Sequence, residues 1–282
     1  MGRGDVTECG LSNLAVCLPE KFIEYLLSII NAPLQILLNL AKSLMTEPVN
    51  ISVFFSLWGV IVYILSMFYG LFIIFAGFNF MISGYDSAKR ENAKSWLKNV
   101  IMMVLFVQAS YILYGFVIEL AALLSAGVMD IIDPNFFLLT ADNIVNVGLQ
   151  FFLGMSYLIA IIVSIIFLAL RYLLVAVGVV FCPIGVFCYF IPPLQGYGKM
   201  VLNVLAVVIF IPFFDAIILF ASSALMSVPI FENFKIVIMT AAFLCINLLM
   251  IFLIVFAMLK AAMAVIESDT GRAAVKIGKY LA

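Results

Sequence analysis

The sequence predicts an all-α, polytopic integral membrane protein with about five net transmembrane crossings. Three observations predict this fold class. Apolar residues make up 67% of the 282 residues and charged residues only 10%, so there is too little polar surface to cover a water-soluble core. Most uncharged runs reach about 20 residues, the length of one helical crossing. The runs are continuous rather than alternating, which favours helices over a transmembrane barrel.

The apolar runs divide the chain into five to seven apolar helices and four regions. The runs are 49–85, 99–118, 143–170, 172–198, 200–231 with Asp215 inside it, and 236–259. We expect a polar segment at 1–20, an amphipathic helix at 21–46, a transmembrane helical bundle at 50–265 and a C-terminal tail at 266–282.

Residues 21–46 show apolar residues at helical spacing, with Pro33 as a predicted kink. This helix either lies in the membrane interface or makes a short extra crossing. Glu24 and Lys42 leave only 17 uncharged residues between them, which favours the interface.

The first span, near 53–83, carries Gly70, Gly77 and Gly84 at intervals of seven residues. Residues seven apart share one helix face, and small residues on a face let another helix approach closely. We therefore predict helix packing at these glycines, either inside this chain or against a second copy in a homo-oligomer.

The segment 147–191 holds 45 residues interrupted only by Arg171. At about 1.5 Å per residue it is about twice as long as a bilayer core is thick. It makes either two crossings, or one crossing with a re-entrant or buried element in 147–193. Prolines at 183, 192 and 193 interrupt its second half.

The basic residues decide between these alternatives under the positive-inside rule. Loop 84–98 carries four Lys/Arg and is placed in the cytoplasm, whereas loop 128–146 carries none. One crossing at 147–193 puts ten Lys/Arg inside and four outside, while two crossings put six inside and eight outside. We therefore predict five crossings in the plasma membrane, with the N-terminus outside and the C-terminus cytoplasmic.

Charges inside apolar runs are candidate functional groups by default. Glu119, Arg171 and Asp215 are the intramembrane candidates, with Arg171 and Asp215 as possible partners. They form either a structural buried pair or part of a water-filled pathway.

The catalytic inventory is thin, because histidine is absent and no phosphate-binding or nucleophile motif occurs. We expect no enzyme activity, no catalytic residues, no metal and no cofactor. Cys9 and Cys17 form a possible disulfide if that end is extracytoplasmic.

Two stretches carry a family resemblance. FxxxAGxxFMISGYDSAKRENAKSWLKN, ending at residue 99, leads directly into a second span, and RYLLVAVGVVFCPIGVFCYFIPPLQGYGKMVLNVLAVVIFIPFFDAIIL begins at Arg171. Over roughly 50–265 the chain resembles the TrbL / VirB-six family of type IV secretion (conjugation) systems, which includes archaeal relatives in the Ced DNA-import machinery.

The resemblance implies a non-catalytic translocation-channel or scaffold subunit, assembled in several copies around a path for DNA or protein. Its partners would be membrane lipid, a pilin, a cytoplasmic ATPase and the translocated DNA or protein. The basic turn, with Lys89, Arg90, Lys94, Trp96 and Lys98, would dock the ATPase or only fix topology. The short outer loop fits an archaeal or Gram-positive-type envelope. A stand-alone secondary transporter or ion channel using Arg171 and Asp215 is the alternative, and a pilin-like subunit is less favoured.

Overall fold

The computed structural model describes residues 14–83, 87–137, 147–226, 228, 230–231 and 234–267. In these residues the chain is helical, with short connections and no strand. The α helices are α1 (Leu14–Thr46), α2 (Phe55–Ile82), α3 (Ser87–Met129), α4 (Val147–Phe190), α5 (Gln195–Leu225) and α6 (Lys235–Glu267). Three short 3₁₀ helices join them: η1 (Ser52–Phe54), η3 (Pro134–Phe137) and η5 (Pro192–Leu194).

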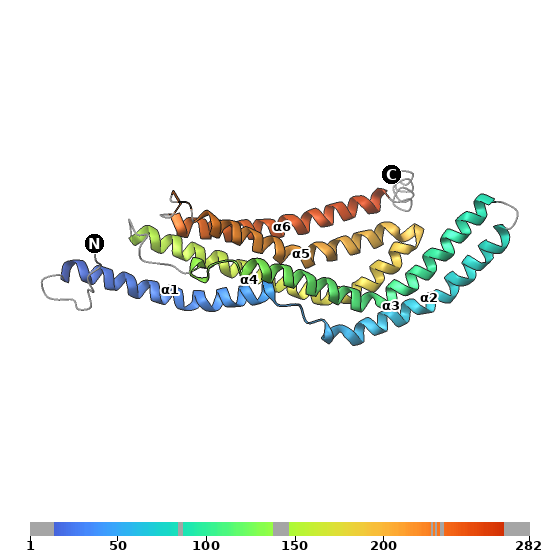
Figure 1. The fold of residues 1–282 in the computed structure, drawn as a ribbon, viewed down its shortest axis with the longest axis horizontal. Coiled ribbons are helices and arrows are strands. Elements are labelled where there is room, and N and C mark those ends of the chain that lie inside the picture. The colour runs from blue at the N-terminus through green and yellow to red at the C-terminus, as the bar shows by residue number, and fades with distance from the viewer. Residues whose placement is uncertain are drawn as a thin grey trace, which may run out of the picture.

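Five helices of the described chain are long and apolar enough to cross a membrane. They are Ser52–Ile82, Lys89–Met129, Phe152–Phe190, Pro192–Leu225 and Lys235–Lys260. This confirms the prediction of an all-α, polytopic fold. The first residues of α1 and the last residues of α6 lie toward opposite ends of the elongated bundle (Figure 1).

The segment 147–190 forms one continuous helix, so of the re-entrant or buried element expected in 147–193 the re-entrant form is wrong. α4 has 44 residues and contains Pro183, and at 1.5 Å per residue it is about 66 Å long. Pro183 removes one backbone donor, a loss that packed transmembrane helices tolerate. The chain turns only at Ile191, which is extended with φ −92° and ψ 113°, the conformation favoured before a proline.

α1 begins at Leu14 rather than at residue 21, and it packs lengthwise against the bundle. Figure 1 shows α1 and then α2 following one another along the same side of α4. Leu34, Ala41 and Met45 of α1 are buried in the core. Ile29, Ile36 and Leu40 of the same helix are exposed, so protein covers only part of its apolar surface, and a position of α1 in the membrane interface stays a prediction.

The core consists of three clusters of buried side chains along the bundle. The first joins α1, α4, α5, α6 and the end of α3, around Tyr157 and Ile246. The second lies in the middle, around Tyr114 and Val179. The third joins α2 and α3 to the end of α4, around Met103. α4 contributes to all three clusters and is therefore the central helix.

Candidate functional site

Arg171 of α4 and Asp215 of α5 lie in the interior of the bundle, with exposures of 5% and 0%. Their charges interact. However, the two carboxylate oxygens of Asp215 have no hydrogen-bond partner, and the Nε of Arg171 has none either. The structure thus brings the two predicted partners into one interior region without a direct ion pair. A buried carboxylate without partners is energetically costly, which marks this region as the candidate site.

Arg171 faces a small cavity at the middle of the molecule. Its volume is about 10 Å³, close to the lower limit for one water molecule. Glu47, Pro48 and Val49 from the α1–α2 connection line it together with Ser125 of α3. Glu47 is exposed, so the buried guanidinium lies below an exposed acidic side chain at the surface.

Two tyrosines near Arg171 were not predicted as site residues from the sequence. The Tyr114 hydroxyl donates to the Val175 carbonyl oxygen at 2.7 Å, and the Tyr172 hydroxyl accepts from the Asn50 backbone N–H at 3.0 Å. Tyr172 follows Arg171 directly in α4, and Tyr114 lies in the same buried cluster as Val175, one helical turn after Arg171. The available signal was a polar aromatic residue inside an apolar run, since a buried tyrosine hydroxyl usually finds a hydrogen-bond partner.

Asn247 of α6 is a further buried polar residue that sequence reasoning missed. Its side-chain amide donates to the Ala160 carbonyl oxygen of α4 at 3.3 Å, while its own carbonyl oxygen has no partner. Glu119, by contrast, is exposed on α3. The structure therefore does not bring this third predicted charge into the interior with Arg171 and Asp215.

The predicted basic turn is the first three turns of α3. Lys89, Arg90, Lys94 and Lys98 are all exposed there. Trp96 faces the other way and packs with Phe72 and Phe75 of α2, at ring-centroid distances of 6.1 Å and 5.2 Å. One helix segment thus anchors α3 to α2 with its aromatic face and presents cations on its free face.

A cleft of about 340 Å³ lies beside this segment. Phe75 and Asn79 of α2 and Lys89, Asn92 and Trp96 of α3 are among the side chains that line it. The cleft combines a cation, amides and aromatic rings, which is a composition suited to binding a polar chain segment.

Gly70 and Gly77 of the predicted glycine face do not pack against another helix in the described part of the chain. A Cβ placed on Gly70 or Gly77 would meet no atom within 4 Å, so the prediction of packing inside the bundle is wrong for these two residues. Gly84 lies outside the described residues. Packing against a second copy stays a prediction.

Two other glycines lie at close contacts between helices. Gly198 of α5 lies against α4, and Gly178 of α4 lies against α3 and α5. At Gly198 a Cβ would lie 2.5 Å from the Tyr189 Cα and 2.7 Å from the Gly185 carbonyl oxygen. At Gly178 it would lie 2.6 Å from a Leu205 methyl group and against the Tyr114 hydroxyl. Only glycine fits at Gly198, where the close atoms are backbone, whereas a side chain at Gly178 would require Tyr114 and Leu205 to move.

The remaining predicted sites are the cysteines and the absence of metal. The Cys9–Cys17 pairing lies outside the described residues, because Cys9 does. Cys182, Cys188 and Cys245 are free thiols. Within the described ranges no group of three or more His, Cys, Asp or Glu side chains is placed to hold a metal ion.

Comparisons with known proteins give no relative. No family model matches the sequence, and neither does a curated protein or a solved structure. The function must therefore be argued from the chain itself.

Proposed function

We propose that this chain is a non-catalytic channel or scaffold subunit of a type IV secretion-like machine that moves DNA or protein. It would lie in the plasma membrane with the N-terminus outside and the C-terminus cytoplasmic, in several copies. The sequence resemblance over 50–265 supports the proposal, together with the five helices able to cross a membrane. The proposed copies would also contact a pilin and a cytoplasmic ATPase.

The observation that carries the proposal is the α2–α3 hairpin. It extends beyond the other helices at one end of the bundle (Figure 1). The cations Lys89, Arg90, Lys94 and Lys98 lie at its tip, exposed and beside the cleft. A projecting basic tip fits an acidic surface of a partner in the cytoplasm, where charge complementarity steers association.

The test is reversal of the tip charge in the full-length protein, as Lys89→Glu, Arg90→Glu and Lys94→Glu together. We expect loss of co-purification with the cytoplasmic ATPase of the proposed machine, and loss of transfer. The matched control reverses Lys199 and Lys260, which lie outside the segment. Cysteine accessibility on both sides of the membrane shows whether orientation is kept. Unchanged co-purification with unchanged orientation would disprove docking at the tip.

A second candidate is a stand-alone secondary transporter or ion channel. The unpartnered, fully buried Asp215 near Arg171 favours it, because ionisable groups inside membranes often line transport paths. Reconstituted protein would then carry ions or a solute across liposomes, and Asp215→Asn would abolish this. Liposomes that stay silent under ion and proton gradients would rule this candidate out in favour of the subunit.

A further inference from the structure

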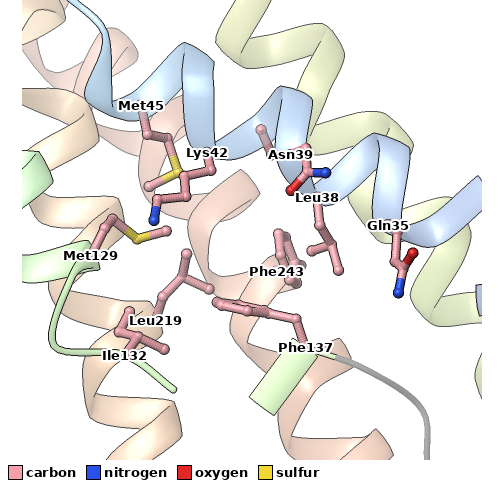
Figure 2. A pocket seen from close by; sticks show the side chains of 11 residues that line it. Gln35, Leu38, Asn39, Lys42, Met45, Met129, Ile132, Phe137, Leu219 and Phe243 are labelled. Carbon is pink, nitrogen blue, oxygen red and sulfur yellow. The ribbon is translucent and has the colours of Figure 1, made fainter. Parts of the chain in front are cut away.

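A cavity of about 280 Å³ lies between α1 and the helices that it covers (Figure 2). Its walls come from four parts of the chain that are distant in sequence. Its apolar lining includes Leu219 of α5, Phe243 of α6 and Phe137 of η3. Its volume is near the lower end of the range for small-molecule sites, roughly 300 Å³.

All polar side chains that line the cavity come from one face of α1. They are Gln35, Asn39 and Lys42, spaced four and three residues apart and therefore aligned along the helix. Figure 2 shows the Lys42 side chain extending from α1 toward Met129 and Leu219. The cavity is thus amphipathic, with polar groups along α1 and an apolar wall opposite.

The Lys42 ammonium is available to a ligand. Its contact with Asp130 is long, at 3.5 Å, and the two side chains are 51% and 73% exposed. Exposed pairs of this kind contribute little, and an ammonium has three donors. Asp130 follows the last residue of α3 and Glu47 follows the last residue of α1, so charged connections lie near the Lys42 end of the cavity.

We propose that this cavity binds one acyl chain of an anionic phospholipid, with the lipid phosphate beside Lys42. The apolar wall excludes polar solutes, because water leaves such a surface readily and a charged solute would lose its hydration there. A membrane supplies acyl chains, and a lysine at the boundary of the apolar region attracts anionic headgroups. The chain lies against Leu219 and Phe243, which fixes α1 to α5 and α6.

The experiment uses the full-length protein, delipidated in detergent, and measures bound lipid by native mass spectrometry. The probes are phosphatidylglycerol and phosphatidylcholine with identical chains. We expect one tightly held phosphatidylglycerol per chain. Lys42→Gln should weaken its binding by about fivefold, the effect of one exposed charge pair, and leave phosphatidylcholine unchanged. Lys260→Gln, an exposed lysine far from the cavity, is the control and should change neither.

A cavity-filling variant, Leu219→Trp, should reduce binding of both lipids by about tenfold or more. Its melting temperature and monodispersity show whether it folds. Leu38→Phe, on the α1 side of the cavity, repeats the test with a smaller change. Equal lipid binding in wild type, Lys42→Gln and both filled variants would overturn the proposal. Displacement of the lipid by glycerol 3-phosphate would overturn it too, by showing a free-anion site. So would a lipid-free dimer that Leu219→Trp abolishes, since a second copy would then fill the cavity.

Discussion

The two helical hairpins α4–α5 and α2–α3 are both strongly apolar but have different surroundings. In the most apolar stretch of α5, 39% of the residues are buried, against 22% in that of α2. Gly198 and Gly178 of the α4–α5 hairpin touch neighbouring atoms, while Gly70 and Gly77 of α2 meet none. The same residue types therefore serve the core in one hairpin and face outward in the other.

The difference extends to the charges. Arg171 and Asp215 of the α4–α5 hairpin are buried, whereas Glu119 on α3 is exposed. Burying these charges in the α4–α5 hairpin costs folding free energy. The α2–α3 hairpin instead has its cations at an exposed tip. We infer that α4–α5 holds the bundle together and that α2–α3 is the part free to contact partners.

The largest effect is expected when one buried charge is removed. Arg171→Met leaves the buried Asp215 without the nearby opposite charge and should lower the free energy of unfolding by about 3 kcal/mol. Adding Asp215→Leu should restore most of it, because the double variant has no buried charge. Unfolding in detergent micelles, followed by circular dichroism during denaturant titration, measures both.

Glu119→Gln is the matched change in the α2–α3 hairpin. It should alter the stability by less than about 0.5 kcal/mol, as exposed substitutions do. If Arg171→Met were as stable as the wild type, or if the double variant were no better than the single one, Arg171 would not compensate Asp215.

The next largest effect comes from the glycines. Gly198→Ala places a methyl group against backbone atoms of Tyr189 and Gly185, which cannot rotate away, and should destabilise by about 1–3 kcal/mol. Gly70→Ala, in open space, should instead stabilise by up to about 1 kcal/mol because alanine favours a helix. The same unfolding measurement compares the two.

A loss of stability in Gly70→Ala would also be informative. In a monomeric preparation it would contradict the open surroundings of Gly70. In an oligomeric preparation, a shift toward monomers in size-exclusion chromatography would show that Gly70 packs against a second copy.

The number and approximate ends of the spans follow from the sequence, because continuous apolar runs between charges leave few alternatives. The positive-inside count also favoured one crossing at 147–193, and α4 is one helix. The packing of α1 along the bundle could not be predicted from the sequence, because an apolar stripe covered by lipid and one covered by α4 have the same sequence pattern. The helix start at Leu14 was equally hidden by the polar residues around it.

The sites show the same division. Arg171 and Asp215 stood out as charges in apolar runs, but their missing hydrogen bonds depend on side-chain geometry. Spacing singled out Gly70 and Gly77, yet spacing says nothing about what faces a helix. Gly178 and Gly198 were overlooked because their neighbours, Tyr114 and Tyr189, come from other positions in the chain.

A smaller effect is expected at the hydrogen bond that joins α2 to α3. The Trp58 indole N–H donates to the Ser110 hydroxyl at 2.9 Å, and Ser110 is buried. Ser110→Ala should cost about 0.6–1.7 kcal/mol, the range for interhelical bonds in membranes, and should shift the Trp58 emission. Ser66→Ala is the control, because the Ser66 hydroxyl bonds only within its own helix, to the Tyr63 carbonyl oxygen. Equal effects of the two variants would contradict a role for the interhelical bond.

The smallest effect is expected at the exposed pair of Lys42 and Asp130, where α1 meets the end of α3. Asp130→Asn should cost less than about 1 kcal/mol, and this cost should vanish in high salt because both groups face solvent. The variant also removes the carboxylate that competes for the Lys42 ammonium. Binding of phosphatidylglycerol should therefore rise in Asp130→Asn while it falls in Lys42→Gln. If both variants bound less lipid, Asp130 would belong to the site, and the headgroup would need a positive as well as a negative charge.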